Sequence, residues 1–149
     1  GKFLFLTLIG FVQAVIIVAV AFVFFKVPVL NVLPTITLAC LGTAMLSSGL
    51  ALLVAALCGS QPQMHALSTF LVLLLSAVGG SMVPRFMMPE WLQNLGQFTP
   101  NHWAIEAFYG VLARGQDASD LLLVWGILFG GAVLSLFLAA ILSHKMMRV

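Results

Sequence analysis

The stretch GGSMVPRFMMPEWLQNLGQFTPNHWAIEAFYGVLARG, residues 79–115, decides how the rest of this chain is interpreted. It mixes apolar and polar side chains at helical spacing, whereas the long segments on either side are almost uniformly apolar. Residues 85–120 hold six of the ten charged side chains and two of the three tryptophans. We therefore expect this stretch to lie at a membrane surface and to cap a bundle of lipid-embedded helices.

The composition indicates an integral membrane protein. The chain has 149 residues, of which 62% are hydrophobic and 7% are charged, whereas a soluble domain carries roughly a quarter of charged residues. So little polar surface cannot cover a globule in water, so the lipid bilayer is the expected surrounding. The net charge of +2 is too small to indicate a nucleic-acid partner.

Four segments are long and apolar enough to cross a membrane, at about residues 3–25, 35–58, 64–83 and 121–143. The first is 23 residues long, and as a helix it would measure about 34 Å against a hydrocarbon core of about 30 Å. The second and third are separated by GSQPQ at residues 59–63, where a glycine can end one helix and Ser and Pro can begin the next. The sequence thus predicts one all-α polytopic transmembrane domain over residues 1–149.

Two shorter amphipathic helices are expected at residues 89–98 and 100–114. Pro89 suits the first position of one, and Thr99 can cap the other with Pro100 at its first position. Both are too short to span the membrane, and each carries a tryptophan suited to the interface. In the second helix, His102 and Glu106 are four residues apart and can pair.

Polar side chains inside the apolar spans are candidates for a transport pathway. Gln13 lies near the middle of the first span, and Thr43 and Ser47 lie in the second. Thr43 and Ser47 belong to a ridge of small residues that recurs at every fourth position, Ala39, Thr43, Ser47, Ala51, Ala55 and Gly59. The sequence leaves two interpretations open, because small residues permit close helix packing and mid-membrane polar groups often face a pathway. Gly126 and Gly130 in the last span are a weak packing signal of the same kind.

The stretch 79–115 resembles the region around the last outer loop of permease subunits of ATP-binding-cassette (ABC) exporters, in their type 2 class. The residues that carry the resemblance are the glycines before Pro84, Met88-Pro89 followed by Trp91-Leu92, and Pro100 with Trp103 and Glu106. The order of three spans, an outer helical pair and a last span is also similar. The resemblance implies that this chain is the C-terminal part of a six-span permease.

The resemblance further implies the partners and the orientation. An ATPase subunit would supply the energy and would face a loop formed by Ser60, Gln61, Pro62 and Gln63. A second permease copy or homologue would complete a dimer. The charges alone leave the orientation open, since Lys2, Lys145 and Arg148 on one side are matched by Lys26, Arg85 and Arg114 on the other. The resemblance places both termini in the cytoplasm and the protein in the cytoplasmic (inner or plasma) membrane.

The shape of the amphipathic pair, too short to span and bent by prolines, suggests an outer gate. The candidate gate residues are Pro89, Trp91, Pro100, Trp103 and Glu106. A gate at this position would open outward after cargo enters and would then reseal. The cargo itself is not predicted by the sequence, although spans this apolar suit a lipophilic or amphipathic molecule.

Motifs for chemistry are absent from the sequence. It contains no G-x-x-x-x-G-K-[ST] for ATP and no H-E-x-x-H for zinc, and its three histidines fall on separate segments. We therefore expect no enzyme activity, no metal and no cofactor in this chain, with ATP bound by the partner subunit. A membrane enzyme and a non-transporting membrane scaffold or assembly factor are the alternatives, and a neighbouring reading frame for a P-loop ATPase would favour the exporter over both.

Overall fold

The computed structural model describes residues 1–146, and within these the chain consists of helices and connecting turns without strands. The helices are α1 (Lys2–Phe25), α2 (Leu33–Leu57), α3 (Gln61–Gly79), α4 (Glu90–Gly96), α5 (Pro100–Leu112) and α6 (Leu122–Met146), with short 3-10 helices at Leu30–Val32, Arg85–Met87 and Ala118–Leu121. Four segments, built on α1, α2, α3 and α6, are long and apolar enough to cross a membrane. The predicted all-α bundle with four spans is confirmed. Arg148 of the basic tail lies outside the described residues.

The third span differs from its predicted range, 64–83, at both ends. Helix α3 begins at Gln61 because the Ser60 side chain caps it, accepting a hydrogen bond from the backbone N–H of Gln63 at 3.4 Å. It ends at Gly79 because Gly80 adopts a left-handed conformation with φ 92° and donates its N–H to the carbonyl of Ser76. Three of the four residues of the predicted 60–63 loop, all except Ser60, therefore form the first turn of α3.

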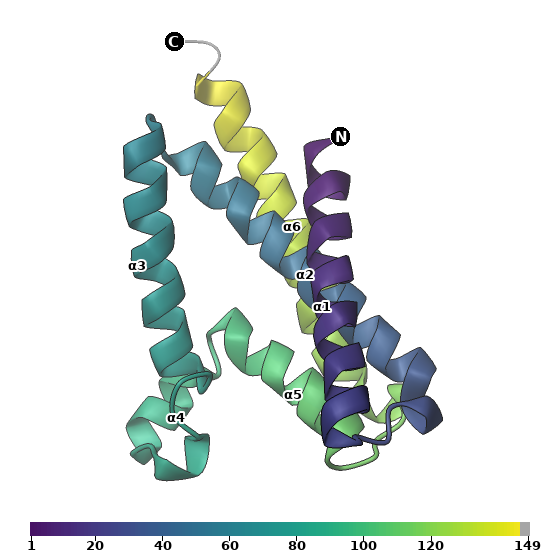
Figure 1. Cartoon of the computed structure of the whole chain (residues 1–149). Helices are drawn as coiled ribbons and strands as arrows, with labels where there is room; N and C mark the ends of the chain where they lie inside the picture. Colours follow the sequence, from purple (N-terminus) through teal and green to yellow (C-terminus); the bar gives the residue numbers. More distant parts are fainter. Residues whose placement is uncertain (147–149) are drawn as a thin grey trace.

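The helices form two groups that meet at their ends. Helices α1, α2 and α6 lie together, whereas α3 stands apart with α4 at its foot, and α5 runs from the foot of α3 back to the other group (Figure 1). The N-terminus, the α2–α3 turn and the end of α6 share one end of the molecule (Figure 1). The predicted amphipathic pair, α4 and α5, occupies the opposite end, as alternation of the four spans requires.

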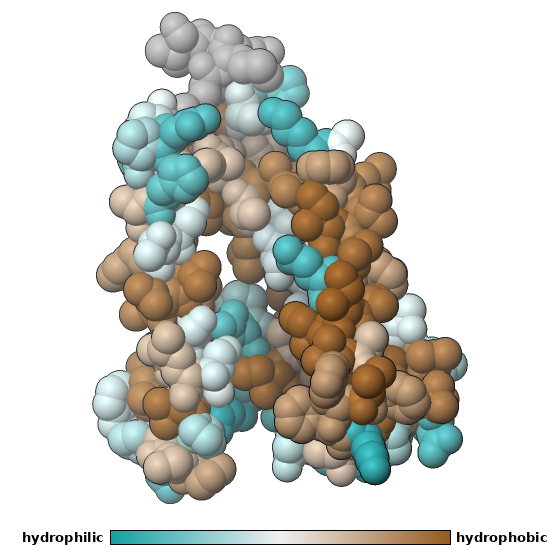
Figure 2. Space-filling view, viewed as in Figure 1, coloured by the Kyte–Doolittle hydropathy of each residue, from teal (hydrophilic) through white to brown (hydrophobic). Residues whose placement is uncertain are grey.

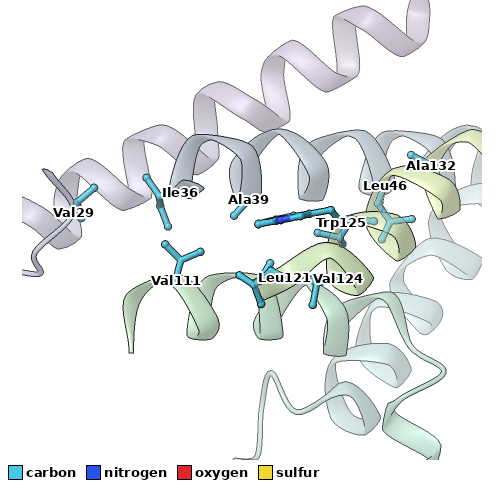
Figure 3. Close-up of a cluster of buried hydrophobic side chains, with 11 residues drawn as sticks. Val29, Ile36, Ala39, Leu46, Val111, Leu121, Val124, Trp125 and Ala132 are labelled. Carbon is cyan, nitrogen blue, oxygen red and sulfur yellow. The ribbon is translucent and has the colours of Figure 1, made fainter. Parts of the chain in front are cut away.

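The packed core of the molecule lies between α2 and α6, with α5 beneath them. Its largest buried side chains include Ile36, Val111 and Leu128, and the Trp125 indole packs with them (Figure 3). The Trp125 Nε1 donates a hydrogen bond to the carbonyl of Ala118 at 2.8 Å. Two helices can approach this closely because α2 has glycine at the contact. A Cβ on Gly49 would lie 3.0 Å from the carbonyl oxygen of Ala132.

Large hydrophobic side chains cover the outside of the spans. None of the most apolar window of α1 is buried, and its phenylalanines at positions 5, 24 and 25 are more than 60% exposed. An apolar surface on this scale is unfavourable in water, so lipid must cover it. Helix α1 is held on α2 by a close contact in which a Cβ on Gly10 would lie 3.3 Å from that of Ala44.

Candidate functional site

A tightly packed corner joins the end of α3 to α4 and the start of α5. A Cβ on Gly79 would lie 2.6 Å from the Cβ of Asn101, and a Cβ on Gly96 would lie 2.7 Å from the carbonyl oxygen of Val78. Only glycine fits at either position, because real Cβ atoms do not approach other atoms so closely. The Asn101 amide also donates a hydrogen bond to the hydroxyl of Ser76, a residue of α3, at 3.3 Å. The corner therefore fixes the amphipathic pair to α3.

Thr99 is the cap of α5, as its sequence position predicts. Its hydroxyl accepts from the backbone N–H of His102 at 3.3 Å and donates to the carbonyl of Gly96 at 2.6 Å. Pro100 occupies the first turn, where a missing N–H costs nothing. One short turn thus ends α4 and starts α5. Pro89, by contrast, is not the first helical residue of α4 but the extended residue before it, with ψ 149°.

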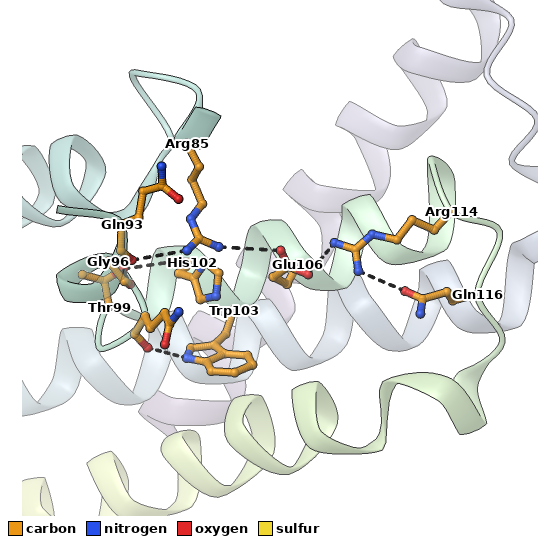
Figure 4. Close-up of polar contacts among 10 residues, drawn as sticks. Arg85, Gln93, Gly96, Thr99, His102, Trp103, Glu106, Arg114 and Gln116 are labelled. Carbon is orange, nitrogen blue, oxygen red and sulfur yellow. Dashed lines mark hydrogen bonds and ion pairs between the residues drawn. The ribbon is translucent and has the colours of Figure 1, made fainter. Parts of the chain in front are cut away.

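The charges of the amphipathic pair converge on Glu106 (Figure 4). Its carboxylate lies 2.7 Å from an Arg114 Nη2 and 4.0 Å from an Arg85 Nη1. Arg85 also donates to the carbonyl of Gln93 at 3.2 Å, so its guanidinium links α4 to α5. We call the residues Arg85, Glu106 and Arg114 the charge cluster. All three side chains are partly exposed, which limits how much the cluster stabilises the fold.

The predicted pairing of His102 with Glu106 is wrong. Within residues 1–146, the two arginines occupy the carboxylate, and the His102 ring is buried edge-on against Trp103 with 5.0 Å between ring centroids. Its Nδ1 has no hydrogen-bond partner in the described part of the chain. Burial lowers the pKa of His102, the neighbouring Arg85 cation lowers that pKa further, and Glu106 opposes both with a smaller effect. The structure therefore favours a neutral imidazole.

The five predicted gate residues divide between the two helices. Pro100, Trp103 and Glu106 belong to α5, where the Trp103 Nε1 donates to the carbonyl of Gln97 at 2.8 Å. Trp91 belongs to α4 and is 64% exposed, and Pro89 is the extended residue directly before that helix. The apolar side of α4 therefore faces outward rather than toward α5, as an interfacial helix would.

Three residues at this end of the molecule were missed by sequence reasoning, namely Arg85, Asn101 and Arg114. The concentration of charge in residues 85–120 was the available signal. That signal did not show which charged side chains pair with each other, because Arg114 follows the end of α5 and Arg85 lies on a separate 3-10 helix.

The three predicted pathway residues lie together on one groove. Gln13, Thr43 and Ser47 all line an open groove of about 390 Å³ between α1 and α2. Thr43 and Ser47 also line a second cavity, of about 340 Å³, between α2, α3 and α5. The middle of α2 is thus a thin wall between two spaces, and its small side chains help to leave those spaces open.

The residues predicted to face an ATPase lie at the end opposite the amphipathic pair. Ser60, Gln61, Pro62 and Gln63 are all exposed around the turn that joins α2 to α3. The Gln63 side chain accepts the backbone N–H of Gly59 at 3.0 Å, and together with the Ser60 cap this gives the turn a fixed shape.

This architecture is that of a polytopic membrane protein with a helical corner on one side, and comparison with known proteins identifies its class. The model of the ABC-2 family transporter proteins matches residues 1–141, so the chain belongs to that family. The linearmycin resistance permease protein LnrN of Bacillus subtilis (strain 168) is 28% identical over 87 residues, which are 58% of this chain and 23% of that relative. The match spans less than a quarter of that relative's length. No solved structure matches the chain.

The chain is therefore a multi-pass permease component of an ABC transporter. The resemblance of residues 79–115 to type 2 ABC permeases is confirmed by the family match, which covers nearly the whole chain. Permease subunits of this family are not themselves enzymes.

Proposed function

We propose that this chain forms part of the translocation pathway of an ABC exporter, driven by a separate ATPase subunit that binds and hydrolyses ATP. The family match over residues 1–141 carries this proposal. The name of the Bacillus relative describes that relative as a permease for resistance to linearmycin. Outward transport is the direction that gives resistance to a toxic compound, which supports the exporter over an importer.

The corner and the charge cluster supply the outer gate. Helix α3 is bound to α4 and α5 through contacts that admit only glycine at positions 79 and 96, so a displacement of α3 moves the amphipathic pair with it. The Arg85–Glu106 contact at 4.0 Å is the longer of the two pairs in the charge cluster. We assign it as the contact that separates when the gate opens, while the Arg114 pair stays within the α5 segment.

The opposite end of the molecule carries the ATPase. The exposed, capped turn at residues 59–63 is the contact surface, and movement transmitted there reaches the corner along α3. A second permease copy or homologue completes the pathway. Both ends of the described chain lie on the cytoplasmic side of the cytoplasmic membrane, and residues 85–118 lie outside.

Two alanine variants test the gate. Trp103→Ala removes the indole that is bonded to Gln97, and Glu106→Ala removes the centre of the charge cluster. We expect both to reduce transport severalfold while leaving binding of the ATPase subunit intact. Glu90→Ala, an exposed acid on α4, is the matched control and should transport normally. Full transport by both gate variants at normal membrane levels would show that the amphipathic pair is a passive connection.

Single-cysteine labelling tests the orientation. In a background without Cys40 and Cys58, a cysteine placed at Asn94 should react with a membrane-impermeant maleimide added from outside, and one placed at Gln61 should react only after the membrane is opened. The reverse pattern would contradict the proposed orientation and, with it, the ATPase surface.

A further inference from the structure

The cavity between α2, α3 and α5 has an uncharged lining. It measures about 340 Å³, and the described residues that line it include no Asp, Glu, Lys, Arg or His. Most of the lining is leucine, valine and alanine, and the polar members are Thr43, Ser47, Ser68, Ser76 and Asn101. The hollow is visible between α3 and the remaining helices (Figure 2). Its size falls within the range of small-molecule sites, about 300–1,000 Å³.

The cavity follows from how α3 is attached. Helix α3 is joined to the molecule at its two ends, by the turn that follows α2 and by the corner at Gly79. Along its middle it faces Thr43, Ser47 and Ala51 of α2, whose side chains are too short to reach across. Apolar surfaces gain little from closing such a gap inside a bilayer, since lipid chains are as apolar as leucine.

The polar groups of the lining are unequally satisfied. The Ser47 hydroxyl donates to the carbonyl of Thr43 at 2.8 Å, and the Ser76 hydroxyl accepts from Asn101. The Thr43 Oγ1 is buried and has no hydrogen-bond partner among residues 1–146. Almost none of the surface of that oxygen is accessible, so a molecule in the cavity would not touch it. The Ser68 hydroxyl also lines the cavity, and it is the polar contact that the lining offers to a bound molecule.

We propose that this cavity is a binding site, within one copy of the chain, for an uncharged and mostly apolar molecule with one hydrogen-bonding group. The Ser68 hydroxyl is the polar contact, and the leucines of α3, among them Leu71 and Leu75, hold the apolar body. A charged ligand is disfavoured, because the lining offers no counter-charge at membrane depth. The identification of the bound molecule as cargo rests on the proposed exporter function. The existence of the binding site does not depend on that function.

Photolabelling with 3-azioctanol tests the site, because this probe has an apolar chain, one hydroxyl and no charge. Membranes from cells that produce the protein are irradiated with the probe, and adducts are located by mass spectrometry of the purified protein. We expect adducts on the cavity side of α2 and α3, around Thr43 and Leu75. Ser68→Ala removes the hydroxyl with little change in shape, and should lower cavity labelling about fivefold, as expected for one hydrogen bond.

Matched tryptophan variants separate the cavity from the lipid-facing side of α3. Leu75→Trp fills the cavity and should abolish labelling there, whereas Leu74→Trp, on a side chain that is 46% exposed, should leave it unchanged. Leu71→Trp with Leu73→Trp as control repeats the comparison one turn away, in case the first variant does not reach the membrane.

The outcomes distinguish the site from the exporter function. Adducts confined to lipid-facing side chains, or cavity labelling that survives both Leu75→Trp and Leu71→Trp, would overturn the site. Absence of cavity adducts would do the same, as expected if a further helix or a second copy fills the space. Cavity labelling with the expected losses supports the site even if the protein proves not to export. Normal transport in a variant that has lost labelling would overturn the cargo role.

Discussion

Helix α2 has two faces that use small residues in opposite ways. On the face toward α6, Gly42 and Gly49 allow contact, and a Cβ on Gly42 would lie 3.3 Å from Leu128 Cδ1. On the face toward α3, Thr43 and Ser47 border a cavity of about 340 Å³. The difference shows that a small side chain in a membrane helix permits close packing only where the facing helix is held against it.

The same difference divides the molecule into a packed body and an attached arm. Helices α1, α2 and α6 form the body, while α3 with α4 forms the arm, which is fixed at its ends (Figure 1). If this division is correct, substitutions at the α2–α6 contact should destabilise the whole protein. Substitutions at the corner should affect the arm alone.

The largest effect is expected at Gly49. Gly49→Leu would force a side chain into the carbonyl of Ala132 and the Cβ of Ser135, which lie 3.0 and 3.1 Å from the position of a Cβ. We expect a loss of about 3 kcal/mol in the free energy of unfolding, since overpacking a close contact typically costs this much. Thermal unfolding in detergent measures it. Gly126→Leu, where a Cβ would meet no atom within 4 Å, is the control; equal losses in both variants would mean that the α2–α6 contact is not the stabilising one.

The corner is the next contact to break. A Cβ on Gly79 would lie 2.8 Å from Thr99 Oγ1 and still closer to Asn101, so Gly79→Ala should cost about 2 kcal/mol locally. Amide hydrogen exchange in residues 76–102 should then accelerate about 30-fold, with α2 and α6 unchanged. Gly59→Ala at the other end of α3, where the nearest neighbour of a Cβ is 3.9 Å away, should change neither. Faster exchange throughout α2 and α6 would argue against a separate arm.

The charge cluster should contribute less than either glycine contact. Glu106→Gln removes the carboxylate charge but keeps its shape, and partly exposed ion pairs are worth about 0.2–1 kcal/mol. We expect a stability loss below about 1 kcal/mol that shrinks further in high salt. The measurement is thermal unfolding at two salt concentrations, with Glu90→Gln as the control. A loss as large as that of Gly79→Ala would show that the cluster, rather than the glycine contacts, holds the arm.

The smallest effect is expected from His102, and it depends on pH. Because burial and Arg85 lower its pKa in the folded protein, the unfolded chain binds this proton more readily. Stability contributed by the neutral ring is therefore fully present above the ordinary histidine pKa of about 6.5 and is lost as the pH falls below it. Thermal unfolding from pH 7.5 to 5 should show this loss. His102→Gln should flatten the profile and His65→Gln, at an exposed position of α3, should not; an identical acid profile in all three proteins would exclude His102 as its source.

The sequence by itself determined the features that depend on neighbours along the chain. Length and hydropathy located the four spans, and the caps at Ser60 and Thr99 were predictable because each bonds a backbone N–H three residues away. The same local rules predicted a short amphipathic pair between the last two spans.

Only the tertiary structure decided which groups meet. A period of four on α2 shows that Thr43 and Ser47 share a face, but it does not show whether that face meets a helix or a cavity. Glu106 was expected to pair with a residue one turn away, yet it pairs with Arg85 and Arg114, which the turns before α4 and after α5 bring to it. Periodicity fixes the direction of a side chain within its own helix, whereas the path of the connecting turns sets what lies opposite.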